Sequence, residues 1–299
     1  MNLVRSSAVA CLFAILALGC TDLKTDLPTP ASSAIRVHDE GWAAEGSANF
    51  HGRYIANAGW DMSLCQSCHG RTYDGGTVNV SCRTCHDQPA GPENCATCHG
   101  STNPAPPRDL GGSTKIASRG VGAHQKHLTA GSISSVTLCS DCHSVPTGLR
   151  SPGHIDSPLP AEVPMNSSLA RTVTNEAGTP DHTDALPQFS PDPSWSPGSV
   201  SCGNTYCHGT FKNGNPTFAP VWNAVTGTQA ACGTCHGDPS RATAALRARP
   251  KTAAEGGTHP VETACADCHS QVVDASLKFV DKSKHINGKL EVFGEVRDF

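Results

Sequence analysis

Cysteine and histidine are the residues whose spacing in this chain points to chemistry. The 299-residue sequence holds 16 Cys and 15 His, and 14 of the cysteines fall into seven pairs with a histidine directly after the second cysteine. Six pairs read C-x-x-C-H and one reads C-x4-C-H. The paired cysteines are Cys65 and Cys68, Cys82 and Cys85, Cys95 and Cys98, Cys139 and Cys142, Cys202 and Cys207, Cys232 and Cys235, and Cys265 and Cys268. The histidines that follow them are His69, His86, His99, His143, His208, His236 and His269.

C-x-x-C-H is the attachment motif of c-type haem. Two thiols add to the two vinyl groups at one porphyrin edge, and the adjacent histidine binds iron as the proximal ligand. Two intervening residues form a single turn that holds all three groups on one side. The sequence therefore predicts seven covalently bound haem c groups, six from the regular motif and one from the longer loop of Cys202 to His208.

Two other uses of cysteine pairs fit this sequence less well. Zinc ribbons take two pairs per metal and need no histidine directly after the second cysteine, and seven pairs would leave one without a partner. Thioredoxin-like redox pairs fail for the same reason, since they do not explain the histidines. For Cys202 and Cys207, a pair without haem or a local disulfide remains an alternative.

Eight histidines lie outside the motifs, one more than bis-histidine ligation of seven irons requires. Methionine is the main competing ligand, but beyond the initiator only Met62 and Met165 exist. We therefore predict bis-histidine haems, with His182 as the surplus histidine. The candidate distal ligands are His38, His51, His124, His127, His154, His259 and His285.

An internal repeat supports this choice. His124, the motif 139–143 and His154 recur in the same order as His259, the motif 265–269 and His285. Further matches align 161–163 with 290–292, while Glu262 takes the place of His127. His182 belongs to neither copy. At least one of the three histidines of the first copy must therefore reach a haem from elsewhere in the chain, and His124 and His127 would share one face of a short helix.

The first residues predict export. An apolar run after Arg5 is too short to span a bilayer as a helix and ends at Ala17-Leu18-Gly19-Cys20. This resembles the lipobox of bacterial lipoproteins, in which Cys20 carries the lipid after cleavage; the alternative is an ordinary secretory signal. We predict an exported outer-membrane lipoprotein on the periplasmic or cell-surface side.

Composition predicts a haem core. Only 37% of residues are hydrophobic and 5% aromatic, with 29 Gly and 22 Pro, too few large apolar side chains for a conventional core. The predicted fold is mostly irregular coil with short helices and a few β-strands, one of them over 289–293, around a stack of haems. The predicted parts are a signal peptide (1–19), a tether (20–36), a three-haem module (37–100), a linker (101–120), a one-haem module with a Pro-rich surface loop (121–200) and a C-terminal three-haem module (201–299).

The chain resembles the multihaem c-type cytochromes of metal-respiring bacteria that carry a C-x4-C-H motif followed by C-x-x-C-H. The resemblance is clearest over Tyr206–Gly209, Cys232–Gly237 and His285–Gly288, whereas the N-terminal third matches in motif only. It implies bis-histidine haems in a continuous chain that passes electrons between the inner membrane or periplasm and acceptors at or beyond the outer membrane.

Charge bears on the partners. The formal net charge is −4, and removal of Arg5 with the leader gives −5. Seven bis-histidine haems with ionised propionates bring this to roughly −12 when ferric and roughly −19 when ferrous. Nucleic acid and anionic membrane surfaces are therefore poor partners. Other redox proteins of the envelope, an outer-membrane porin or a metal-oxide acceptor suit the charge better, with membrane contact through the lipid anchor.

Two functions follow from these predictions. An electron-transfer relay, which is not an enzyme, needs seven six-coordinate irons and no substrate pocket. A multihaem reductase of the nitrite or sulfur-oxyanion type needs one open iron flanked by acid–base groups. The single surplus histidine favours the reductase weakly, because loss of one further ligand would open a haem. The lack of a C-x-x-C-K motif and the presence of only three tyrosines favour the relay.

Overall fold

A computed structural model describes residues 37–298 except 101, 130 and 132. The predicted signal peptide, the lipid-bearing Cys20 and the tether lie outside the described residues. The chain divides into two compact units, the first ending at Asp61 and the second beginning at Met62. All seven cysteine motifs belong to the second unit. In the described part of the chain, no helix has the length and apolarity needed to cross a bilayer.

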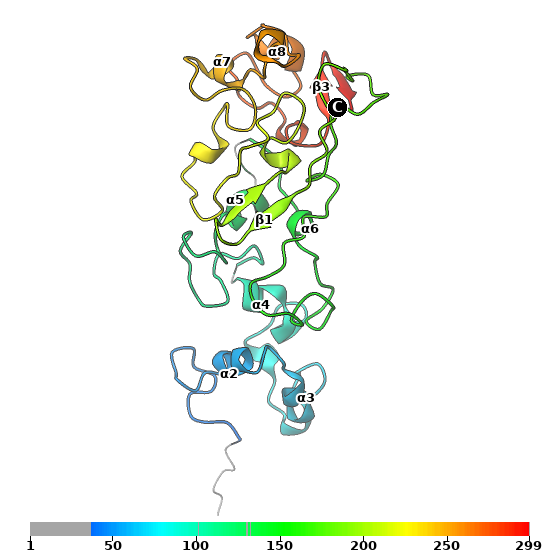
Figure 1. The fold of residues 1–299 in the computed structure, drawn as a ribbon. Coiled ribbons are helices and arrows are strands. Elements are labelled where there is room, and N and C mark those ends of the chain that lie inside the picture. The colour runs from blue at the N-terminus through cyan, green and yellow to red at the C-terminus, as the bar shows by residue number, and fades with distance from the viewer. Residues whose placement is uncertain (1–36, 101, 130, 132, 299) are drawn as a thin grey trace, which may run out of the picture. The chain divides into compact units, whose positions relative to one another are not determined.

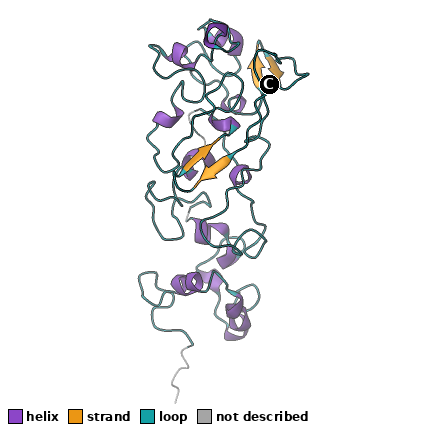
Figure 2. Ribbon diagram, viewed as in Figure 1, coloured by secondary structure: helices purple, strands orange, loops and turns teal. Residues whose placement is uncertain are grey.

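Regular structure is sparse, as predicted. Short helices and two small sheets are joined by long stretches of loop (Figures 1 and 2). The α-helices are α2 (His51–Asn57), α3 (Ser63–His69), α4 (Cys95–His99), α5 (His124–Leu128), α6 (Cys139–Cys142), α7 (Ala244–Ala248) and α8 (Cys265–His269). The 3₁₀ turns are η1 (Gly76–Val78), η2 (Cys82–Thr84), η3 (Gly91–Glu93), η4 (Tyr206–His208), η5 (Thr228–Ala230), η6 (Ala253–Glu255) and η7 (Lys282–Lys284).

The helices of the second unit coincide largely with the cysteine motifs. Four motifs lie on α3, α4, α6 and α8, so the single turn predicted for C-x-x-C-H is present at each of them. The cap of α4 is explicit, because the Asn94 side chain accepts a hydrogen bond of 2.9 Å from the backbone N–H of Ala96. Helix α3 ends before Gly70, whose φ of +84° favours glycine. Short helices of this kind are marginal in isolation, so tertiary contacts must hold them in place.

Two antiparallel hairpins make up the sheets. β1 (Ser194–Ser196) pairs with β2 (Ser201–Gly203), which places Trp195 opposite Cys202. β3 (Leu290–Val292) pairs with β4 (Glu295–Arg297). The strand predicted over 289–293 is therefore present, and Glu291 at its centre is buried.

The protein core is small. Among the described residues, eight hydrophobic residues are buried: Met62, Tyr73, Ala105, Val121, Ala123, Met165, Ala170 and Tyr206. Met165 adjoins the fourth motif, since its N–H donates to the Cys142 carbonyl at 3.1 Å. So small a core is what the composition led us to expect of a chain that packs around bound groups.

The Pro-rich segment after the fourth motif is irregular, as expected, but it is not only a surface loop. Thr174 and Asn175 are its most buried residues, with no solvent exposure. The Thr174 side chain accepts from the Lys212 backbone N–H at 2.7 Å, and the Asn175 amide donates to the Thr183 carbonyl at 2.9 Å. The prediction of a surface loop was wrong at these positions, because their side chains satisfy buried backbone groups that sequence composition does not reveal.

Candidate haem-binding centres

Five motif histidines face a second histidine ring from outside the motifs. The centroid distances span 5.9 to 6.4 Å. The pairs are His99 with His154 (5.9 Å), His143 with His124 (6.3 Å), His208 with His127 (6.0 Å), His236 with His285 (6.3 Å) and His269 with His259 (6.4 Å).

This spacing fits two axial ligands of one iron. A metal–imidazole bond is about 2.0 Å long and a ring nitrogen lies about 1.1 Å from the ring centre, so two rings bound on opposite sides of an iron have centroids about 6.2 Å apart. All five pairs lie within a few tenths of an ångström of that value. The residues present therefore fit a bis-histidine haem at five of the seven motifs.

Hydrogen bonds orient these rings for ligation. In ten histidines other than His182, Nδ1 lies within hydrogen-bond distance of a backbone carbonyl, which can only accept. Nδ1 must therefore carry the hydrogen, and Nε2 keeps the lone pair that binds a metal. The motif histidines of this group are His69, His143, His236 and His269, and the others are His51, His124, His127, His154, His259 and His285.

His182 differs from this group. Its Nδ1 lies 3.3 Å from the Asn175 carbonyl and its Nε2 lies 2.7 Å from a carboxylate oxygen of Asp184. Both ring nitrogens are thus hydrogen-bonded within the same loop, and no nitrogen is presented for a metal. This arrangement fits the surplus role predicted for His182, which stays a prediction.

Burial favours the neutral form of six of the paired imidazoles. It lowers the pKa of His124, His208 and His236 to about 4, and lowers the pKa of His99, His259 and His285 as well. A neutral imidazole is the form that ligates iron.

The motif cysteines are free thiols, those of the C-x4-C-H loop included. Burial raises the pKa of Cys202 and Cys207 to about 12 and that of Cys142 to about 11. Zinc binds thiolates, which this burial opposes, whereas thioether formation with a porphyrin leaves no charge on sulfur. Within the part of the chain that the structure describes, no cluster of three or more His, Cys, Asp or Glu side chains is arranged to hold a bare metal ion.

The internal repeat of the sequence is also a repeat of geometry. In each copy the first histidine faces the histidine of its own motif, with ring planes 23° apart for His124 and His143 and 17° apart for His259 and His269. The last histidine of each copy, His154 or His285, instead faces the histidine of the motif that precedes the copy.

The backbone carbonyls that accept hydrogen bonds from the proximal histidine rings also repeat between the two copies. His143 Nδ1 lies 2.8 Å from the Glu162 carbonyl, and His269 Nδ1 lies 2.6 Å from the Glu291 carbonyl, at the aligned position. The two copies therefore hold their own motif histidine with the same backbone group. His127, the residue replaced by Glu262 in the second copy, faces His208 of the C-x4-C-H loop.

Motifs that follow one another in sequence are also neighbours in space within the second unit. The electrostatic effect of a residue in the adjacent motif shifts the pKa of a motif cysteine or histidine. In every case this shift is smaller than the shift caused by burial. Such shifts link Cys82 to Cys65, His99 to His143, Cys202 to Cys142, Cys207 to Cys235, and His236 to His269.

Tyr73 connects the second motif to the third, the pair of successive motifs that these pKa shifts do not link. Its carbonyl accepts from the Cys82 N–H at 3.0 Å, and its hydroxyl donates to Glu93 at 2.8 Å, two residues before Cys95. Gln66, between the cysteines of the first motif, donates to the same hydroxyl at 3.0 Å. One buried residue thus joins three motifs, through its backbone carbonyl and its hydroxyl.

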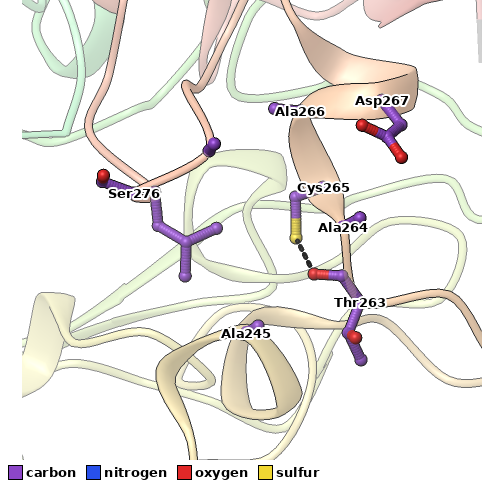
Figure 3. Close-up of a pocket in the computed structure, with 9 residues that line it drawn as sticks. Ala245, Thr263, Ala264, Cys265, Ala266, Asp267 and Ser276 are labelled. Carbon is purple, nitrogen blue, oxygen red and sulfur yellow. Dashed lines mark hydrogen bonds between the residues drawn. The ribbon is translucent and has the colours of Figure 1, made fainter.

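A pocket borders the seventh motif (Figure 3). Cys265 lines it, and its thiol donates to the Thr263 carbonyl at 3.5 Å. Ala245, Ala264 and Leu277 supply small and apolar walls. A half-buried thiol beside an apolar wall is the surrounding that a porphyrin edge requires.

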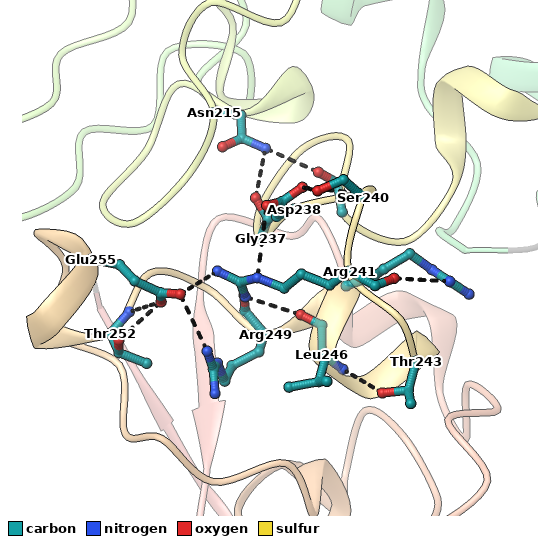
Figure 4. Close-up of polar contacts among 12 residues, drawn as sticks. Asn215, Gly237, Asp238, Ser240, Arg241, Thr243, Leu246, Arg249, Thr252 and Glu255 are labelled. Atoms are coloured by element: carbon teal, nitrogen blue, oxygen red, sulfur yellow. Dashed lines mark hydrogen bonds and ion pairs between the residues drawn. The ribbon is translucent and has the colours of Figure 1, made fainter.

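A polar network fixes the loop after the sixth motif (Figure 4). Glu255 accepts from Arg241 at 2.6 Å and from Arg249 at 3.3 Å, and its second oxygen accepts from the Thr252 N–H at 2.9 Å. Arg249 continues from the turn in which the Ala248 carbonyl lies 2.6 Å from His236 Nδ1. The network therefore holds the backbone that orients a proximal ring.

Two predicted distal ligands, His38 and His51, are not among the five histidine pairs described above. His38 and His51 lie in the first unit, where His38 stacks on Trp42 with centroids 4.4 Å apart and His51 Nδ1 lies 2.8 Å from the Trp42 carbonyl. Their role as distal ligands stays a prediction. Tyr73 and Trp222 also contribute to these sites, although no local sequence pattern marks either residue.

Comparison with known proteins finds one match. Residues 201–236 match the family model described as the Geobacter CxxxxCH...CXXCH motif, which spans the C-x4-C-H loop and the following C-x-x-C-H. This segment includes the C-x4-C-H and C-x-x-C-H motifs of the resemblance to multihaem cytochromes, whereas His285–Gly288 lies outside it. No curated protein and no solved structure matches the chain.

Proposed function

We propose that this chain is a seven-haem electron-transfer relay with six-coordinate, bis-histidine irons. The observation that carries the proposal is the set of five histidine pairs at axial separation. An iron with protein ligands on both sides has no position for a substrate, so it can pass electrons but cannot reduce a bound oxyanion.

The spatial order of the motifs supports a relay. Each motif from the first to the last lies next to its successor in sequence, so electrons can step between neighbouring sites along the second unit.

Haem content and ligation are tested together on purified holoprotein. Intact mass and the pyridine haemochrome assay should give seven haems per chain. Absorption and EPR spectra should show low-spin haem that carbon monoxide leaves unchanged. A high-spin fraction of about one haem in seven that binds carbon monoxide would refute the relay and point to a multihaem reductase.

We further propose that the relay works at the cell envelope in anaerobic or extracellular respiration, tethered to the outer membrane by lipid on Cys20. The leader sequence supports export, and the negative charge supports a basic redox protein, a porin or a metal oxide as partner. Cys20→Ser should move the haem-stained protein from the membrane fraction to the soluble fraction. Equal membrane association of both forms would refute the lipid anchor.

A further inference from the structure

Helix α5 serves two haem sites at once. His124 faces His143 of the fourth motif, and His127 faces His208 of the C-x4-C-H loop. The two histidines are three residues apart on one helical turn, so any rotation of α5 turns both rings. The helix has five residues and no side-chain cap, and its position must therefore come from what it packs against.

Trp222 packs against both rings. Its indole stacks on His127, with centroids 5.5 Å apart and planes at 27°, and meets His124 edge-on, with centroids 4.7 Å apart and planes at 90°. Stacked and edge-to-face contacts are the two favoured aromatic arrangements, and each opposes rotation of the ring that it touches.

The indole is itself fixed from the other side. Its Nε1 donates to the Arg119 carbonyl at 2.8 Å, and the Trp222 backbone N–H donates to the Val200 carbonyl at 2.8 Å. Cys202 N–H donates to the Pro220 carbonyl at 3.3 Å, so the segment just before the indole is hydrogen-bonded to strand β2, which carries the haem cysteine. Trp222 thus connects Cys202 with the histidine that faces His208.

Gly122 shows how close this packing is. Its φ is +42°, and a methyl group added to its Cα would collide with the indole nitrogen. The backbone directly before α5 therefore lies against the edge of the indole, and a side chain at position 122 would displace it.

We propose that Trp222 is a positioning residue that sets the ring planes of His124 and His127, and through them the axial geometry of the haems at Cys139–His143 and Cys202–His208. The His127 and His208 planes stand 77° apart, whereas those of His124 and His143 stand 23° apart. The proposal rests on the haem ligation proposed above.

EPR spectroscopy tests this, because near-perpendicular axial imidazoles give a strongly anisotropic low-spin signal with a large maximum g value, and near-parallel ones give a rhombic signal. Subtracting the His127→Ala spectrum from that of the unaltered holoprotein identifies the signal of the Cys202–Cys207 haem. Trp222→Ala should convert that signal to a rhombic or high-spin one and shift the haem's reduction potential in a redox titration. Trp195→Ala is the matched control, since it removes an indole that lies opposite Cys202 and meets Trp222 edge-on with ring centroids 6.4 Å apart.

Two more variants decide the outcome if Trp222→Ala loads fewer than seven haems. Trp222→Phe keeps a ring that can stack and should restore most of the anisotropic signal. Gly122→Ala keeps the indole but pushes it aside, and should alter the signal as Trp222→Ala does. An unaltered signal and potential in Gly122→Ala or in fully loaded Trp222→Ala would overturn the positioning role. Lack of any large-g signal in the unaltered holoprotein would instead overturn the proposed haem ligation. Failure of the positioning role and failure of the ligation are therefore distinguishable.

Discussion

The imidazole of His285 faces that of His236 with ring centroids 6.3 Å apart and planes at 77°. His285 is anchored far from its own segment, because its Nδ1 lies 2.6 Å from the carbonyl of Ile133. A residue near the end of the chain is therefore held opposite the sixth motif by a backbone group from the middle of the chain.

His285→Ala should open one iron. Loss of the distal ring leaves the iron bound at His236 five-coordinate, so about one haem in seven should become high-spin and bind carbon monoxide. Absorption spectra with and without carbon monoxide measure this change.

His182→Ala is the control for that variant. Both nitrogens of His182 are hydrogen-bonded to the protein, so all haems should remain low-spin. If His182→Ala opened an iron and His38→Ala did not, the surplus histidine would be His38 and the ligand assignment would need revision.

Two classes of low-spin haem are expected in the EPR spectrum. The pairs His127–His208 and His236–His285 have planes 77° apart and should give large-g signals. The pairs with planes 17° to 32° apart should give rhombic signals. His127→Ala and His285→Ala should each remove a different large-g component. Removal of the same component by both variants would contradict the pairing.

Tyr73→Phe should destabilise the region of the first three motifs. The hydroxyl bonds to Glu93 and Gln66 in a side chain only 3% exposed, and burial raises the Tyr73 pKa to about 12. Loss of both hydrogen bonds should lower the free energy of unfolding by about 1–2 kcal/mol. Denaturant titration of the holoprotein measures it. Tyr54→Phe, at a tyrosine 51% exposed, should change little, and an equal loss in both variants would argue against the role of Tyr73.

Glu255→Gln should weaken the polar network in a pH-dependent way. Hydrogen bonds from Thr252 and the nearby Arg241 and Arg249 hold the pKa of Glu255 below its ordinary value. A lowered folded-state pKa contributes stability above the ordinary value of about 4.3, and this stability is lost as pH falls through the folded-state pKa.

Thermal unfolding of the holoprotein checks this sign. Glu255→Gln should lower the unfolding midpoint at pH 7, and the difference from the unaltered protein should shrink as pH falls below about 4. Glu295→Gln, which alters an exposed glutamate that pairs with Arg297 two residues away, is the control and should have little effect at either pH. A pH-independent difference for Glu255→Gln would contradict the electrostatic explanation.

The sequence by itself determined the cysteine motifs, the helical turns that carry most of them, the strand near the C-terminus and the set of histidines available as ligands. These features are local or a matter of counting. Two thiols and a histidine that must reach one porphyrin edge have to be neighbours along the chain, and one turn of helix suffices to place them.

The tertiary structure decided which histidine faces which motif. His154 faces His99 and not the motif directly before it, and His127 faces His208 although it lies beside His124. These pairings depend on chain segments brought together from far apart, and a count of histidines contains no information on that. Trp222 lay outside the sequence argument for the same reason, because its contacts with α5 and with the strand of Cys202 come from packing and leave no periodic pattern in the sequence.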